Sequence, residues 1–367
     1  MKIIYFITGL TIGGAEVVTV NLANAMVLKG YDVTIVCLSG KNEWMNRISY
    51  RIKVVNLEMK KNCVGFIRAQ KKAVQIISEI KPDVIHSHMF HSNIFVRLLR
   101  LHTNIAYLVT TEHNKYIGGI YRMWMYRLTD KLSDINTNVS EEATKYFIDI
   151  KAFSKKKTVT IYNGINLNQF QCDRTTRSSI RAQLGINDDV FLFLNVGRLT
   201  TAKNQQGLVK AFANVVLIKP NVKLLIVGNG ELRNNLLDLV ESLSLSNKII
   251  FLPAQLNICD FYNAADCFVL FSSWEGFGLV LAEAMACQLP VIATNAGGCA
   301  EVVSNENYVI PVGDSNLLIK KMLEICQMSL EERVSLGRDN RKLVMRFDIN
   351  YIEKQWDILY QRQMLYL

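Results

Sequence analysis

One segment of the chain combines two carboxylates with two glycines in an order suited to anion binding. After an apolar run, Glu275, Gly276, Gly278 and Glu283 follow, with seven residues between the two glutamates. The glycines would turn the chain and let a ligand approach its main chain, and we expect a helix to begin there. The start of that helix offers unpaired N–H groups and a positive dipole end to an anion. Glu283 would lie in the second turn, among apolar residues, where it needs a polar partner.

Two cations follow another predicted strand. Arg198 and Lys203 come after the apolar run 190–196 and precede a helix predicted over 206–217. Arginine supplies a rigid forked donor and lysine a mobile point charge, a pairing suited to two linked phosphates. The sequence contains no Asp-x-Asp pair that would hold a divalent ion on a diphosphate, so protein cations would have to neutralise it. The alternative is an ordinary solvated surface.

A third glycine-rich turn gives a weaker signal. Gly228 and Gly230 follow the apolar run 223–227, but the third glycine of a dinucleotide-binding fingerprint would fall at Arg233. The pattern is incomplete, and we expect no nicotinamide cofactor. A phosphate-binding Gly-x-x-x-x-Gly-Lys-Ser/Thr loop is absent from the sequence as well.

The elements that must position these residues alternate between strands and helices. Apolar, β-branched runs predict strands over 2–8, 32–38, 84–86, 106–110, 135–139, 158–161, 190–196, 223–227, 249–252, 267–271 and 290–293. Helical periodicity between them, for example over 15–29, 65–80 and 93–101, indicates repeated βα units and parallel, doubly wound sheets. Ligands of such sheets bind at the carboxyl ends of the strands.

The pattern is interrupted once, over 167–178, where we expect a linker without regular structure. The fold class predicted is therefore α/β, with two Rossmann-like doubly wound domains facing across a cleft. We place the domains at 1–168 and 169–345, followed by a terminal segment over 346–367. A length of 367 residues fits two domains.

Composition narrows the class of protein. Half of the residues are hydrophobic and a fifth are charged, as in globular proteins. The longest stretch without charge, 284–300, contains proline and glycines, so we expect no membrane-spanning helix. Eight cysteines without a Cys-x-x-Cys pair indicate neither a disulfide framework nor a zinc site, and favour a cytoplasmic location.

The net charge of +10 is distributed unevenly. Residues 1–170 carry 23 Lys and Arg against 12 Asp and Glu, whereas the rest of the chain carries 19 against 20. The first half therefore holds the whole excess. Nucleic acid, an anionic membrane surface or an acidic substrate would each suit such a half, and a solvated surface is the bland alternative.

Taken together, the motifs resemble those of retaining glycosyltransferases of the GT-B fold, in particular glycosyltransferase family 4. The spacing of Glu275 and Glu283 is similar to the Glu-(seven)-Glu signature of that family. The block 197–204 resembles its diphosphate clamp, and Asn163-Gly164-Ile165 its domain-junction element. Gly13-Gly14-Ala15-Glu16 resembles its first glycine loop. The likeness extends over both predicted domains, and it implies that 346–367 forms a terminal helix that crosses back to the first domain.

The resemblance implies roles for individual residues of the second domain. Glu283 would accept hydrogen bonds from the ribose hydroxyls of a nucleotide, and Glu275 would hold hydroxyls of the donor sugar. Arg198 and Lys203 would bind the diphosphate and stabilise it as it leaves, in place of a metal. Main-chain N–H groups would come from Gly276, Phe277, Gly278 and Leu279.

In the first domain, the resemblance implies that Gly14 belongs to the donor-binding loop and that His113 is the active-site histidine, which reaches toward the transferred sugar. His88 and His91, expected in the loop after the preceding strand, would line the acceptor side. His86, inside a strand, is better explained as a core residue. A His-x-His spacing also suggests a metal, but no third ligand is evident.

The implied function is a metal-independent, retaining glycosyltransferase that uses no cofactor. It would move a sugar, most often from a UDP-sugar in this family, to a lipid-diphosphate-linked glycan of O-antigen, lipopolysaccharide or capsule assembly. Lys60 to Lys72, and Lys115 to Lys131 with Tyr116, Tyr121, Trp124 and Tyr126, would dock on the inner face of the cytoplasmic membrane as a peripheral contact. A nucleotide-sugar epimerase of the same fold is the alternative enzyme, and a nucleic-acid binding protein the alternative class.

Overall fold

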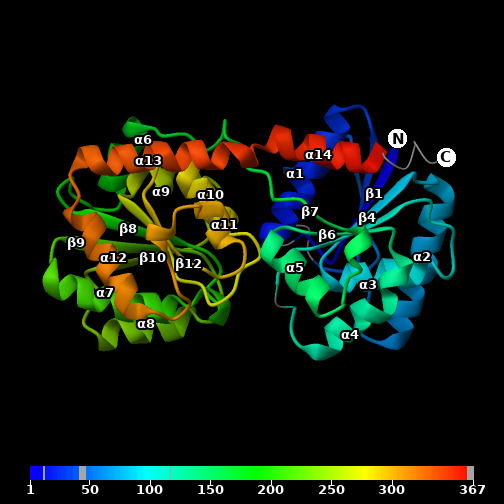
Figure 1. Ribbon diagram of the computed structural model, residues 1–367, viewed down its shortest axis with the longest axis horizontal. Helices are drawn as coiled ribbons and strands as arrows, with labels where there is room; N and C mark the ends of the chain where they lie inside the picture. Colours follow the sequence, from blue (N-terminus) through cyan, green and yellow to red (C-terminus); the bar gives the residue numbers. More distant parts are fainter. Residues whose placement is uncertain (11–12, 41–46, 116, 362–367) are drawn as a thin grey trace. The chain divides into compact units, whose positions relative to one another are not determined.

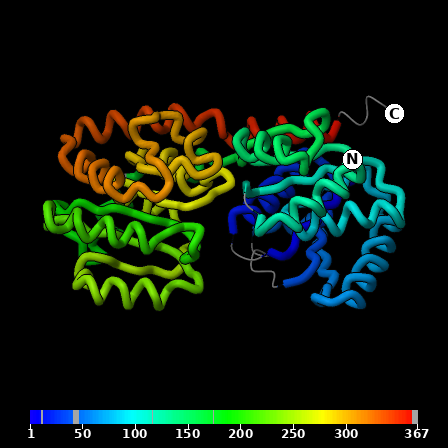
Figure 2. Tube along the Cα trace, turned by 60° about the horizontal axis from the view of Figure 1, so that its bottom comes forward, coloured from blue at the N-terminus to red at the C-terminus, as the bar shows by residue number. Residues whose placement is uncertain are grey.

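The computed structural model describes residues 1–10, 13–40, 47–115 and 117–361, which form two compact α/β units. One unit contains Met1–Gly164 and Asn350–Leu367, and the other contains Ile165–Ile349. The chain trace in Figure 2, coloured along the sequence, shows the first unit built from its blue to green part and the second from its green to orange part. The last helix belongs to the first unit again.

The first unit is built on a parallel sheet, which has seven strands within the described residues, in the order β3-β2-β1-β4-β5-β6-β7. The strands are β1 (Lys2–Ile7), β2 (Asp32–Cys37), β3 (Lys53–Asn56), β4 (Val84–His88), β5 (Leu108–Glu112), β6 (Ile135–Asn138) and β7 (Thr158–Thr160). The strand order reverses between β1 and β4. Ligands of open α/β sheets bind at such a reversal, outside the carboxyl ends of the strands.

Helices cover both faces of this sheet (Figure 1). They are α1 (Gly14–Leu28), α2 (Cys63–Ile80), α3 (Phe90–Leu99), α4 (Ile120–Thr129), α5 (Glu141–Asp149) and α14 (Ile349–Gln361). Side chains of β1 alternate between two cores: Ile3 and Tyr5 pack with α1 and α14, whereas Ile4 and Phe6 pack with α2 and α3. This period of two explains why the strand is apolar throughout.

The second unit repeats the plan, with six parallel strands among the described residues, in the order β10-β9-β8-β11-β12-β13. They are β8 (Phe191–Val196), β9 (Val222–Val227), β10 (Ile249–Leu252), β11 (Cys267–Leu270), β12 (Val291–Thr294) and β13 (Val309–Ile310). Its helices are α6 (Arg174–Gln183), α7 (Gln205–Ile218), α8 (Arg233–Ser242), α9 (Ile258–Ala264), α10 (Leu279–Ala286), α11 (Cys299–Val303), α12 (Ser315–Gln327) and α13 (Leu330–Val344). The order reverses between β8 and β11.

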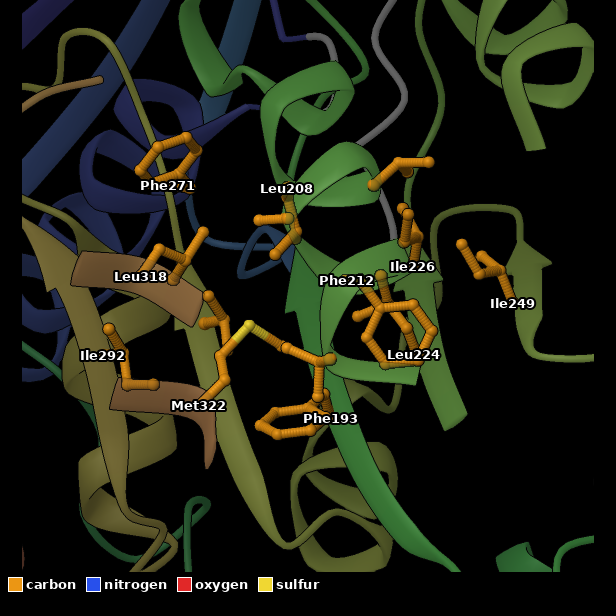
Figure 3. Close-up of a cluster of buried hydrophobic side chains, with 14 of the residues drawn as sticks. Phe193, Leu208, Phe212, Leu224, Ile226, Ile249, Phe271, Ile292, Leu318 and Met322 are labelled. Carbon is orange, nitrogen blue, oxygen red and sulfur yellow. The ribbon is translucent and has the colours of Figure 1, made fainter. Parts of the chain in front are cut away.

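The core of the second unit shows how apolar periodicity fixes this arrangement. Leu208 and Phe212 of α7 and Leu318 and Met322 of α12 belong to one hydrophobic cluster with Phe193 of β8, and all five side chains are fully buried (Figure 3). Residues four apart on a helix lie on one face, so each helix contributes one apolar stripe to the sheet. The predicted α/β class with two Rossmann-like units is confirmed.

The predicted strands are all present, with small shifts at their ends, and the structure adds β3 and β13, two short edge strands. The prediction of an irregular linker over 167–178 is wrong, because α6 begins at Arg174. Its sequence is almost entirely polar, so no apolar stripe marks it. Asp173 caps its N-terminus, and Arg177 and Arg181 pair with Asp266 at 2.7 and 3.3 Å. Polar contacts hold this helix in place.

Candidate active site

An ion pair lies at the strand-order reversal of the second sheet. Lys203, after β8, pairs through its Nζ with Oε1 of Glu275, after β11. Ser272 Oγ donates to the same oxygen at 2.9 Å. The Lys203 side chain is 20% exposed and that of Glu275 is 9% exposed, so the pair is largely shielded from water. The structure thus brings together two side chains that the sequence motifs place 72 residues apart.

Glycines let neighbouring loops approach the backbone on both sides of this pair. A Cβ on Gly297, whose φ is +55°, would lie 2.1 Å from the carbonyl oxygen of Glu275. A Cβ on Gly228 would lie 1.9 Å from the carbonyl oxygen of Gly197, and one on Gly230 would lie 2.3 Å from that of Leu199. Gly228 and Gly230 therefore leave room for the loop that contains Arg198. This close packing accounts for the two glycines without a bound dinucleotide.

The loop between Glu275 and α10 has the form expected for an anion-binding helix start. Gly278 is the N-cap of α10 with φ +85°, and it has no side chain to cap the first turn. Phe277 is buried and packs edge-on against the Phe347 ring, with centroids 5.1 Å apart. The N–H of Gly298 donates to the carbonyl of Gly276 at 3.0 Å, which fixes the turn. Leu279 begins the helix and is half-buried.

Glu283 has the polar partner that its apolar surroundings led us to expect. Tyr262 of α9 donates its hydroxyl to Glu283 Oε2 at 2.9 Å. Burial, with Glu283 nearby, raises the pKa of the Tyr262 phenol well above its usual value, so this hydroxyl keeps its proton and serves as the donor. The contact orients Glu283 on the second turn of α10.

The second predicted cation comes from the same loop as Lys203. Arg198 is exposed, and Gln205 Nε2 donates to its carbonyl oxygen at 3.1 Å. The aliphatic part of Lys203 covers Gly197, where a Cβ would lie 3.5 Å from Lys203 Cε. Both cations therefore come from the loop after β8, at the carboxyl end of the parallel strands, where α10 also begins.

The first unit gathers its candidate residues at the ends of β1, β4 and β5. His88, the last residue of β4, is fully buried, and its Nδ1 lies 3.0 Å from Nε2 of His113. Gly14 opens α1 after β1; it is exposed, and a Cβ there would meet nothing within 4 Å. Residues 11–12 of the same glycine loop lie outside the described part of the chain.

Burial keeps this histidine pair neutral. Burial lowers the pKa of the His113 imidazole to about 4, and that of His88 falls well below its usual value through burial and the neighbouring histidines. Glu112, just before His113, is also buried, and its pKa rises to about 7, although the Tyr126 hydroxyl donates to it at 2.6 Å. His113 is therefore a neutral hydrogen-bonding group near pH 7.

Three residues differ from their expected surroundings. His88 lies in β4 and His91 in α3, so neither is in a loop after the strand. Tyr126, expected at a membrane surface, is fully buried against Phe90 and Phe147 of the first unit. Its helical position, two residues from the exposed Trp124, places it on the inner face of α4. Tyr116 lies outside the described residues.

The sequence motifs assign no role to Ser272, which begins the glutamate segment, or to Tyr262, and these two residues orient Glu275 and Glu283. The position of Ser272 at the end of β11 was a usable signal, since strand ends define the site. Nothing in the sequence marks Tyr262, because its partner lies on a different helix.

Comparison with known proteins agrees with this geometry. A family model described as Glycosyltransferase Family 4 matches residues 12–169, and one described as Glycosyl transferases group 1 matches residues 176–343. An uncharacterized glycosyltransferase from Methanocaldococcus jannaschii is 31% identical over 335 residues, which cover 78% of this chain and 81% of the relative. The chain therefore belongs to glycosyltransferase family 4, and its fold is of the GT-B type.

Two further matches concern named donors. The UDP-Gal:alpha-D-GlcNAc-diphosphoundecaprenol alpha-1,3-galactosyltransferase of Escherichia coli is 25% identical over 303 residues, with 78% of each chain covered. The crystal structure of Anabaena HepE in complex with UDP-glucose has a TM-score of 0.85 at 22% identity, with 100% of both chains covered. The protein is thus an enzyme, a glycosyltransferase.

The ion pair generates a stability prediction. Lys203→Met should lower the free energy of unfolding by about 2 kcal/mol, because it leaves a shielded carboxylate without its cation. Replacing Glu275 by Gln in the same protein should recover more than half of that loss. Urea unfolding of the single and double variants measures both effects.

Lys342→Met is the matched control, since the Lys342–Asp339 pair is exposed and should contribute less than about 0.5 kcal/mol. An unfolding midpoint of Lys203→Met equal to that of the wild type would show that the pair does not stabilise the ligand-free protein.

Proposed function

We propose that this enzyme is a retaining, metal-independent glycosyltransferase that moves a sugar from a nucleoside diphosphate sugar, most simply a UDP-sugar, to a lipid-linked glycan in cell-surface polysaccharide assembly. The observation that carries the donor half of this proposal is the Lys203–Glu275 pair beside the start of α10. A cation, a carboxylate and a helix N-terminus thus lie at the strand-order reversal of the second sheet. The cation and the helix N-terminus suit the diphosphate, and the carboxylate suits the sugar hydroxyls.

The proposed donor site uses each group for a separate part of the ligand. The diphosphate would lie between Lys203, Arg198 and the main-chain N–H groups of the α10 start. Once the diphosphate attracts Lys203, Glu275 would be released to accept hydrogen bonds from the sugar hydroxyls. Glu283, oriented by Tyr262, would hold the ribose. A UDP-sugar agrees with the names of the Escherichia coli relative and the Anabaena HepE complex.

The proposed acceptor side lies on the first unit. Helices α2, α3 and α4 pack in sequence beside one another, and Figure 1 shows them on one side of the sheet. On α4, Ile120, Tyr121, Trp124 and Leu128 are exposed, and the Arg127 guanidinium lies 5.2 Å from the Trp124 ring centroid. On α2, Val64 and Ile67 are exposed between basic residues.

Positive charges from α4 and from the segment before α2 both act on His91, which lies on α3 between the two helices. His91 of α3 is exposed, and its pKa is lowered by partial burial and by the positive charges of Arg122 and Lys61. A face with exposed aromatics and lysines suits the headgroup region of an anionic membrane. Within the described residues the structure has no helix long and apolar enough to span a membrane. We propose a peripheral contact at the inner face of the cytoplasmic membrane, with the acceptor diphosphate near His91.

The transfer assay tests the whole proposal. Purified protein with UDP-sugars and a polyprenyl-diphosphate-linked sugar should release UDP and extend the lipid-linked glycan with retention at the anomeric carbon. Transfer should persist in EDTA, because Arg198 and Lys203 neutralise the departing diphosphate. Loss of transfer in EDTA with recovery in magnesium would contradict the cationic clamp, and donor epimerisation without transfer would contradict the reaction.

Removing one charge tests the ribose contact. Glu283→Gln keeps the shape of the side chain but loses charge-assisted hydrogen bonds, so UDP affinity should fall about tenfold. Isothermal titration calorimetry measures it, with Glu241→Gln on the exposed surface of α8 as the control. Unchanged UDP binding in a folded Glu283→Gln protein would rule out this role.

Liposome co-sedimentation tests the docking surface. Binding should require anionic lipid and weaken with salt, because screening acts within a Debye length of about 8–10 Å. Trp124→Ser combined with Arg127→Glu and Lys131→Glu should abolish binding. The matched control combines Leu217→Ser and Lys320→Glu, which are also exposed but lie on α7 and α12. Equal binding to neutral and anionic vesicles would refute electrostatic docking.

A further inference from the structure

Three histidines form a buried row in the first unit. His86 and His88 are two residues apart on β4, so they point to the same face of the sheet, and their ring centroids are 4.0 Å apart. His113 follows β5, the neighbouring strand, and its Nε2 lies 3.0 Å from His88 Nδ1. His86 and His88 are completely buried, whereas His113 is 7% exposed.

The three rings differ in how their nitrogens are used. Both nitrogens of His86 have partners, the Tyr360 hydroxyl and the Thr111 hydroxyl, each at 2.6 Å. His88 and His113 share a single hydrogen bond. Within the described residues, His88 Nε2 and His113 Nδ1 are buried and have no hydrogen-bond partner. His86 is therefore a structural residue. In the pair, His88 Nε2 and His113 Nδ1 remain able to form a further hydrogen bond.

A neutral imidazole carries one N–H, and burial lowers the pKa of both rings, so the shared bond has two possible arrangements. If His113 donates, the remaining N–H of the pair lies on His88 Nε2, in the interior, without an acceptor. If His88 donates from Nδ1, the remaining N–H lies on His113 Nδ1, at the end of a strand. A buried N–H without a partner is costly, so the second arrangement is favoured whenever a ligand oxygen reaches His113.

We propose that His88 is a positioning residue: its Nδ1–H donates to His113 Nε2 and thereby fixes His113 as an Nδ1–H donor toward an oxygen of the bound sugar. This inference rests on the role that the family resemblance implies for His113, the histidine that reaches toward the transferred sugar. It also replaces the expectation that His88 lines the acceptor side, because the ring is fully buried and bonded to His113.

The tautomer can be read directly by NMR with ¹⁵N-labelled histidine, because protonated and unprotonated ring nitrogens resonate in separate ranges. The chain has only five histidines, so single substitutions assign them. In the wild type with a UDP-sugar bound, His113 should carry its proton on Nδ1. An Asn side-chain amide places an N–H close to the position of Nδ1, so His88→Asn should preserve this tautomer. His88→Gln moves the amide toward the position of Nε2, so the Nδ1–H tautomer of His113 should no longer be fixed.

The same matched pair tests the effect on catalysis. His88→Gln should lower kcat about tenfold with little change in KM for the donor, since the nucleotide contacts lie in the second unit, and His88→Asn should retain most of the activity. His102→Gln, at an exposed histidine, is the control. Equal melting temperatures for the Asn and Gln variants would exclude a general packing defect.

Two results, each measured with a UDP-sugar bound, would overturn the proposal: His113 protonated on Nε2 in the wild type, or an unchanged His113 tautomer in His88→Gln. His113→Ala separates this inference from the proposed function on which it rests. Full transfer activity in His113→Ala would show that His113 has no role in the reaction. If His113→Ala loses activity but His113 in the wild type is protonated on Nε2, only the role of His88 is contradicted.

Discussion

The ion pair between Lys203 and Glu275 is the interaction on which the candidate site depends. Two opposite charges, 72 residues apart in the chain, meet at the ends of β8 and β11, where the strand order of the second sheet reverses. The parallel topology forces loops apart at this reversal and leaves room for a ligand. Gly297 permits a close approach of the backbone to Glu275, and Gly228 permits one to Gly197 in the loop that leads to Lys203.

This constraint includes hydrogen bonds that fix the position of the Glu275 carboxylate. Ser272 donates to Glu275, and Thr294 Oγ1 donates to the carbonyl of Ser272 at 2.7 Å, so the carboxylate is held by a short polar chain from β12. A diphosphate that binds Lys203 must compete with Glu275 for it. We infer that donor binding exchanges one ion pair for another and so avoids the cost of a shielded lysine without a counter-charge.

The sequence predicted the parts of this structure that local rules control. Apolar runs predicted the strands of both sheets. The motifs placed Arg198, Lys203 and Glu275 in the segments that follow strands and Glu283 in the second turn of a helix, where the structure has them. It missed α6, because that helix is held by Arg177, Arg181 and a cap rather than by an apolar stripe. Contacts between distant elements, such as Tyr262 with Glu283 or His88 with His113, leave no periodic signal in one sequence. Tyr126 was misplaced for the same reason, since its inward direction depends on the packing of α4.

Calorimetry of UDP and of a UDP-sugar with the Glu275→Gln protein tests the central claim most directly. If Lys203 must leave Glu275 to bind the diphosphate, the variant should bind UDP at least as tightly as the wild type, because its lysine is already released. Its preference for the UDP-sugar over UDP should disappear with the sugar contact. A loss of UDP affinity of about tenfold or more in a folded Glu275→Gln protein would contradict the exchange of partners at Lys203.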